Sequence, residues 1–230
     1  MNKQLALAIK INDEATLEDF NWSANILLKQ QIDYMLTLNT DKFLYLWGAV
    51  GSGKSHILQG ICQSIPRDLS GIYLPLKMLK PWGPQAIEGL EDQDLICIDD
   101  IDEISGDAVW EEALFHLYNR VKDAERGVLV ISGLTPPPQL PIVLPDLKSR
   151  LSWGLVFQLN ELDDETKINT LRLHAAKRGF ELPELVGQFL LSRCSRNMHD
   201  LFDALNRLDE ASLAAHRKIT IPFVKTILAV

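Results

Sequence analysis

Cysteine is scarce in this sequence. The 230 residues contain only Cys62, Cys97 and Cys194, which are far apart and lie within apolar segments. An odd number of widely separated cysteines argues against a disulfide framework and against a zinc site. We therefore expect free thiols and a reducing compartment.

Long hydrophobic runs are also missing. No apolar segment approaches the roughly 18 residues that a membrane-spanning helix needs. The first residues, MNKQLALAIKIND, resemble a signal peptide only briefly, because Lys10 interrupts the apolar stretch and no small-residue cleavage site follows. The sequence predicts a cytoplasmic protein with no membrane partner.

An excess of basic residues is absent as well. Lys and Arg number 23 against 31 Asp and Glu, which gives a formal net charge of −8. A protein that holds duplex DNA through many phosphates usually carries a basic face, so we expect any contact with DNA to be indirect. A chain of this length, 47% hydrophobic, can bury a substantial core. It fits one large domain, or a medium domain with a small one.

Apolar runs alternate with helical stretches from residue 17 to about 160. Short apolar runs separated by helices are typical of a parallel sheet that is covered on both faces. The expected strands are 43–47, 71–76, 94–99, 127–132 and 154–159, and a long amphipathic helix is expected over about 107–124. The predicted fold class is α/β.

Only helical periodicity remains after about residue 160. Gly179 would end the first of these helices, Pro183 would lie in the first turn of the second, and Thr220 would cap the last. The expected helices are 163–178, 183–194, 197–215 and 221–228. The expected domains are an extended arm over 1–16, an α/β domain over 17–160 and a small helical domain over 161–230.

Residues 48–55 read GAVGSGKS and lie between an expected strand and an expected helix. They match the P-loop pattern, whose glycines let backbone N–H groups turn toward phosphate oxygens at a helix N-terminus. Lys54 would reach the β- and γ-phosphates of ATP or ADP, and Ser55 would hold Mg²⁺. An ordinary glycine-rich turn is the alternative. The expected nucleotide-binding residues here are Gly48, Val50, Gly51, Ser52, Gly53, Lys54, Ser55 and His56.

The apolar segment LICIDD (95–100) ends in two acids, Asp99 and Asp100. A P-loop ATPase needs a carboxylate there to hold Mg²⁺ through water, and often a second one to orient the attacking water. Asp99 fits the first role and Asp100 the second. Because aspartate reaches less far than glutamate, the sequence indicates weak intrinsic ATP hydrolysis. A solvated strand end is the alternative.

Four segments carry a family resemblance: GAVGSGKSHIL, LICIDDID, FHLYNR (115–120) and LKSRLSWGL (147–155). They resemble the AAA+ core of the DnaA-related family from about residue 17 onward. The resemblance implies an AAA+ P-loop NTPase core followed by a small all-α lid domain. DnaA itself continues into a helix-turn-helix domain, which we do not expect here. The short length, the arm and the endings LYNR and IPFVK resemble the Hda branch of that family.

The family resemblance assigns roles to two residues of the α/β domain. Arg150 matches the arginine finger, which stabilises charge on the nucleotide of a neighbouring subunit and contributes on the order of 10³–10⁵ in rate. A surface arginine beside Asp146 is the alternative. Ser132 matches the polar residue that faces the γ-phosphate. In DnaA-like proteins an acidic residue and an arginine usually follow it, whereas Gly133 and Leu134 follow it here.

His199 occupies the position at which the family has its lid sensor arginine. Histidine is shorter and mostly neutral at pH 7. Three readings therefore stay open: His199 contacts the nucleotide, Arg196 one turn earlier replaces it, or His199 is a partly buried helix residue without a ligand role.

The arm contains Gln4, Leu5 and Leu7, in a sequence that resembles the Q-L-x-L motif by which Hda and other proteins dock into the DNA polymerase III sliding clamp. Two leucine anchors and one amide on an extended segment suit such a pocket. A frayed or strand-adding terminus is the alternative.

Four of the tryptophans, Trp47, Trp82, Trp110 and Trp153, are expected to be packing residues rather than base stackers.

The resemblance implies a regulator of replication initiation. It would bind ADP or ATP with Mg²⁺, dock on the clamp, and present Arg150 to ATP held by DnaA, with DNA reached only through the clamp. By resemblance, the ADP-bound form would be the working one, and self-assembly is left open. The alternative is a stand-alone ATPase or helicase-loading protein that acts on DNA through its own hydrolysis. A small-molecule kinase fits less well, because it needs neither the four C-terminal helices nor the finger.

Overall fold

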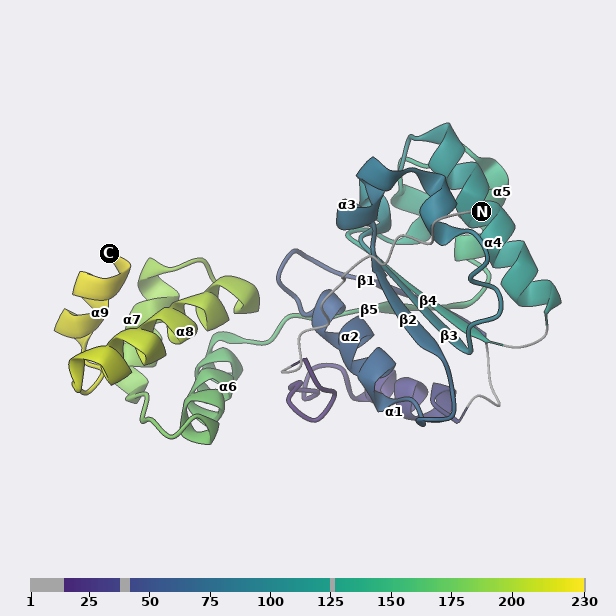
Figure 1. Ribbon diagram of the computed structural model, residues 1–230. Helices are drawn as coiled ribbons and strands as arrows, with labels where there is room; N and C mark the ends of the chain where they lie inside the picture. The colour runs from purple at the N-terminus through teal and green to yellow at the C-terminus, as the bar shows by residue number, and fades with distance from the viewer. Residues whose placement is uncertain (1–14, 38–41, 125–126, 230) are drawn as a thin grey trace. The chain divides into compact units, whose positions relative to one another are not determined.

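The computed structural model describes residues 15–37, 42–124 and 127–229 (Figure 1). The chain forms two compact units. The first extends to Leu159, apart from the short segment Val50–Gly53, and the second holds that segment together with the residues from Asn160 onward. Among the described helices, none combines the length and the apolar character needed to cross a membrane.

The first unit is built on a five-stranded parallel sheet in the order β2-β3-β4-β1-β5. The inner strands β3 and β4 are buried along their whole length, whereas the edge strand β5 alternates between partly exposed and exposed residues. The five predicted strands are confirmed to within one residue at each end. The strands are β1 (Phe43–Trp47), β2 (Gly71–Pro75), β3 (Leu95–Asp99), β4 (Val128–Gly133) and β5 (Leu155–Gln158).

Helices cover both faces of the sheet, as Figure 1 shows. One face packs against α1 and α2, and the other against α3, α4 and α5. The long helix α4 buries residues at positions 110, 114, 117 and 121, the one-sided spacing of an amphipathic helix. The helices of this unit are α1 (Ile26–Met35), α2 (Lys54–Ser64), α3 (Leu76–Leu79), α4 (Ala108–Asp123) and α5 (Pro145–Leu151), with short 3₁₀ turns at Lys80–Trp82, Pro84–Ile87, Ile101–Glu103 and Pro137–Gln139.

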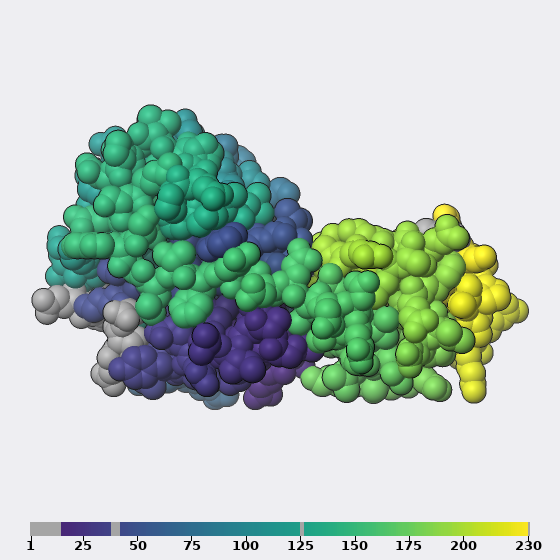
Figure 2. Space-filling view, turned by 180° about the vertical axis from the view of Figure 1, so that it is seen from behind, coloured from purple at the N-terminus to yellow at the C-terminus, as the bar shows by residue number. Residues whose placement is uncertain are grey.

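The start of the described chain packs beside the last strand of the sheet. Figure 2 shows these residues, in purple, next to the green β5 segment. Leu28 and Ile32 of α1 lie in one apolar cluster with Leu159, which follows β5. The segment before the P-loop is therefore part of the core of the first unit.

The second unit is a bundle of four helices with its own apolar core. Its caps follow the sequence: the Asp163 side chain accepts from Thr166 N at 2.7 Å, and the Thr220 hydroxyl accepts from Phe223 N at 3.4 Å. Gly179, with φ of 86°, follows the first helix as expected. Pro183, expected in the first turn of the second helix, is its N-cap instead. The helices are α6 (Asp164–Lys177), α7 (Glu184–Arg193), α8 (Met198–Ala215) and α9 (Ile221–Leu228).

Candidate functional site

The loop after β1 has the backbone of a phosphate cradle. Gly51 and Gly53 adopt φ values of 77° and 102°, a region that is costly for residues with a Cβ atom. The Gly48 N–H donates to the Gly133 carbonyl at 3.2 Å, which ties the start of the loop to the end of β4. Val50 is 70% exposed. The Ser52 hydroxyl oxygen is buried and has no hydrogen-bond partner among the described residues, so it is free for a ligand oxygen.

Lys54 is a buried lysine at the first position of α2. Its ammonium donates to the carbonyl oxygens of Gly48 and Ala49 at 2.9 and 3.0 Å. Burial lowers the pKa of Lys54, and the negative charges of Asp100 and Asp99 oppose that shift. The ammonium group of Lys54 is therefore shielded from water, and a bound phosphate would stabilise its positive charge.

Asp99 ends β3 with both carboxylate oxygens occupied. Oδ2 accepts from the Tyr73 hydroxyl at 2.6 Å, and Oδ1 accepts from the Ser132 hydroxyl. All three side chains are buried. Tyr73, on the adjacent strand β2, was missed by the sequence analysis, because the sequence gives no pairing of strands that would bring it to Asp99. Burial, and then the Asp99 charge, raises the pKa of the Tyr73 phenol.

Oxygen donors that suit Mg²⁺ gather at this point. The side chains of Ser55 and Gln59 lie close enough to the Tyr73 hydroxyl to influence its pKa, and Asp99 is hydrogen-bonded to the same hydroxyl. Hydroxyl and carboxylate oxygens are the ligands that Mg²⁺ takes, usually with several of its waters retained. The oxygen atoms of Ser55 and Asp99 therefore have the chemistry that would suit the metal.

Asp100 takes an unusual backbone conformation, with φ of 59° and ψ of 59°. Its N–H donates to the Ser132 hydroxyl oxygen at 3.0 Å, so that Ser132 joins both acids. Burial, and next the charge of Asp99, raises the pKa of Asp100. The Ser132 hydroxyl therefore links the two acids in this structure, and its expected role facing the γ-phosphate stays a prediction.

The two predicted histidines have local partners. The His56 ring contacts the Thr16 carbonyl through Nε2 at 2.7 Å and lies 5.7 Å from the Phe20 ring, so it fastens the segment before α1 to the P-loop helix. His199, on α8 of the second unit, has a 74% exposed side chain and lies 3.5 Å from Asp203. Arg196 lies 3.6 Å from Asp164.

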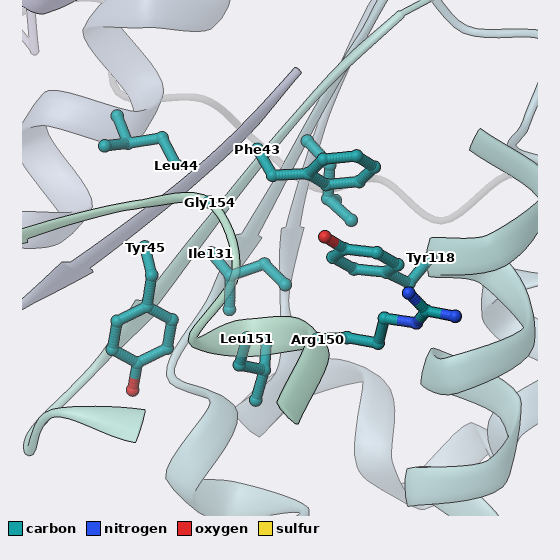
Figure 3. A pocket seen from close by; sticks show the side chains of 9 residues that line it. Phe43, Leu44, Tyr45, Tyr118, Ile131, Arg150, Leu151 and Gly154 are labelled. Atoms are coloured by element: carbon teal, nitrogen blue, oxygen red, sulfur yellow. The ribbon is translucent and has the colours of Figure 1, made fainter. Parts of the chain in front are cut away.

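Arg150 lies in the last turn of α5, near the amino ends of the strands, whereas the P-loop follows the carboxyl end of β1. It lines a small pocket with Phe43, which begins β1, and with Gly154, which precedes β5; Figure 3 shows its guanidinium beside the Tyr118 ring. Lys54 and Asp99 lie instead at the carboxyl ends of the strands. In the described part of the chain the Arg150 guanidinium forms neither a hydrogen bond nor an ion pair, so its N–H donors are available.

The helix that carries Arg150 is fixed by a buried carboxylate that the sequence analysis missed. Glu111 of α4 is fully buried and accepts from the N–H groups of Gly106, Val143 and Leu144. The last two residues lead directly into α5. No local pattern marks this glutamate, since its partners are up to 33 residues away.

The tryptophans correct one expectation. Trp110 is buried as predicted, at 3% exposure, but Trp82 and Trp153 are 48% and 66% exposed. The prediction that these two would be packing residues was wrong. Hydrophobic character alone suggested burial, whereas Trp153 instead faces two cations, Lys122 and Arg150. Gln4, Leu5 and Leu7 of the arm lie outside the described residues.

A parallel sheet with a P-loop after β1 and acids at the end of β3, followed along the chain by a helical unit, defines the AAA+ class of P-loop proteins. The family model of the bacterial DnaA ATPase domain matches residues 85–158, and that of the Hda lid domain matches residues 164–228. The chain is an Hda-like member of the DnaA-related AAA+ family.

Comparison with individual proteins finds a close sequence relative and solved structures of the same fold. An uncharacterized protein of Haemophilus influenzae is 44% identical over 229 residues, 99% of each chain. Domain III of the Thermotoga maritima replication initiation protein DnaA superposes with a TM-score of 0.82 at 24% identity, covering 96% of this chain and 98% of that one. AMPPCP-bound DnaA from Aquifex aeolicus gives a TM-score of 0.73 at 22% identity, over 85% of this chain and 65% of the other. The structural likenesses show the fold.

Proposed function

We propose that this chain is a regulator of replication initiation that stimulates ATP hydrolysis on DnaA in trans. It would bind ADP or ATP in its own P-loop, dock on the sliding clamp through Gln4, Leu5 and Leu7, and present Arg150 to the nucleotide of DnaA. The docking step rests on the sequence of the arm alone.

The observation that carries the proposal is the position of Arg150. The arginine lies near the amino ends of β1 and β5, and the P-loop follows the carboxyl end of β1. A five-residue strand spans roughly 13 Å, so Arg150 is poorly placed to serve the nucleotide of its own chain. Its donors make no hydrogen bond or ion pair with the described residues. A planar fork of free N–H groups suits a phosphate on another molecule.

The chain's own pocket would act as a switch rather than as a turnover site. Bound nucleotide would supply the phosphates. Its Mg²⁺ would neutralise the negative charge that develops during phosphoryl transfer. Lys54 and the free Ser52 hydroxyl would hold the phosphates, and Ser55 with Asp99 would hold Mg²⁺. Asp100 has a shorter reach than glutamate, which supports weak intrinsic hydrolysis, and we propose that the ADP form is the active one.

Arg150→Ala is the test. The variant should fold, retain nucleotide and bind the clamp normally, but lose stimulation of ATP hydrolysis by purified DnaA in the presence of DNA-loaded clamp. Removal of an arginine finger costs on the order of 10³–10⁵ in rate. Arg193→Ala is a matched control, because Arg193 also lies over an aromatic ring, 6.0 Å from that of Phe189, but in the second unit.

Equal stimulation by wild type and Arg150→Ala would refute the trans-acting role. If the isolated wild-type chain has a robust ATPase activity of its own and Arg150→Ala loses it, the result would instead favour a self-assembling ATPase whose finger acts on other copies of the same chain.

A further inference from the structure

Trp153 presents an exposed ring to two cations. Its residue exposure is 66%, and it follows α5 by two positions. The Lys122 ammonium lies 4.4 Å from the ring centroid and the Arg150 guanidinium carbon 4.9 Å from it. Both distances are within the roughly 6 Å at which a cation is attracted to an aromatic face.

Among the described residues, no acidic partner brings the two cations together. Neither Lys122 nor Arg150 forms an ion pair or a side-chain hydrogen bond with any residue that the structure describes. Like charges repel, so their common approach to one ring requires an attraction that offsets the repulsion. The Trp153 ring supplies that attraction.

An aromatic ring restrains an arginine in a way that a carboxylate cannot. A carboxylate would occupy the N–H groups of the guanidinium, whereas a ring contact leaves all five donors available for hydrogen bonds. A free arginine also carries about 2 kcal/mol of rotamer entropy, part of which is lost when it binds an anion. Restraint by Trp153 would remove some of that loss beforehand. Tyr118 lies beside Arg150 in the pocket that both residues line (Figure 3).

We propose that Trp153 is a positioning residue for Arg150, which holds the guanidinium in a preset direction while its donors remain free for a phosphate on a partner molecule. The inference rests on the proposed role of Arg150 as a finger. Trp153 itself need not touch the phosphate.

The contact can be tested in the isolated chain by NMR of ¹⁵N-arginine-labelled protein. The Arg150 side-chain Nε–Hε signal, identified by its loss in Arg150→Lys, should be displaced by the ring current of Trp153. In Trp153→Leu it should return toward the position of a free arginine. Trp82→Leu is the control, since Trp82 is also exposed but no cation contact to its ring is found in the described residues. An unchanged Arg150 signal in Trp153→Leu would overturn the inference.

The functional consequence is measured by DnaA-directed ATP hydrolysis. Trp153→Leu should lower the maximal stimulation about 2- to 5-fold, which corresponds to about 0.5–1 kcal/mol at 1.36 kcal/mol per tenfold. Trp153→Phe should restore most of the rate, because a phenyl face still attracts the cation. Both variants should unfold at the wild-type temperature, as the replaced ring is largely exposed.

The outcomes separate the inference from the proposed function. A Trp153→Leu variant that only needs a higher concentration for half-maximal stimulation, with an unchanged maximum, would make Trp153 a docking residue and overturn its positioning role. If Arg150→Ala abolishes stimulation while Trp153→Leu is fully active, the inference alone fails. If Arg150→Ala is fully active, the finger itself fails, and with it the positioning role.

Discussion

Glu111 offers the most direct way to disturb the helix that carries Arg150. Its Oε1 accepts from Gly106 N at 2.7 Å, and its Oε2 accepts from Val143 N at 2.9 Å and from Leu144 N at 2.8 Å. The side chain has no exposure to solvent. One buried carboxylate therefore joins the turn before α4 to the segment that enters α5.

The expected cost follows from these contacts. Glu111→Ala would leave three partly buried N–H donors without their acceptor, at up to about 1–3 kcal/mol each. The sum, roughly 3–9 kcal/mol, is comparable with the whole stability of a typical domain, about 5–15 kcal/mol. We expect that variant to be poorly folded. Glu111→Gln keeps one acceptor oxygen and turns an amide NH₂ toward the remaining donor, so its cost should be about 1–3 kcal/mol.

The measurement is urea unfolding of Glu111→Gln, followed by circular dichroism and compared with Glu112→Gln. Glu112 is the adjacent residue, its side chain is 70% exposed, and it lies 3.6 Å from His116 on the same helix. Loss of that exposed pair should change stability by less than about 0.5 kcal/mol. If the two variants unfold at the same urea concentration, the buried carboxylate does not hold α5 as argued.

Three further changes test the pocket and the arm. Lys54→Ala should weaken nucleotide binding by about 10–100-fold, because a charge-assisted contact contributes roughly 1.5–3 kcal/mol, and stoichiometric nucleotide on the purified variant would contradict this. Alanine at Gln4, Leu5 and Leu7 together should abolish clamp pull-down with unchanged thermal unfolding, and wild-type clamp affinity would reject the docking motif. Asp100→Asn should raise the urea midpoint, since asparagine tolerates a left-handed backbone and removes a charge that burial disfavours; a lower midpoint would count against that reasoning.

The sheet and the P-loop were predictable from the sequence because their signals are local. A parallel strand buried on both faces reads as a short apolar run, and the P-loop needs glycines at fixed spacing. Helix α5 was not predicted. It has seven residues, of which only Leu147 and Leu151 are buried, too few for a helical period to stand out.

The partners of the site residues could not be predicted, because they come from distant parts of the chain. Tyr73 and Asp99 are 26 residues apart, and Ser132 is 33 residues beyond Asp99. The contact between them depends on strand order, which no local pattern records. Exposure of Trp153 is a similar case. The apolar character of its side chain predicts burial, and only the arrangement of α4 and α5 brings two cations to its ring.

The nucleotide pocket and the finger are held by separate sets of contacts. Lys54, Asp99 and Ser132 are linked to the P-loop and to the carboxyl ends of the strands. The position of Arg150 depends on Glu111 and Trp153, which lie near the amino ends of the strands. No hydrogen bond between side chains of the described residues joins the two sets. Any effect of bound nucleotide on the finger must therefore pass through the sheet or the backbone, and loss of Arg150 can leave the chain's own pocket intact. That separation is what a residue acting on another molecule requires.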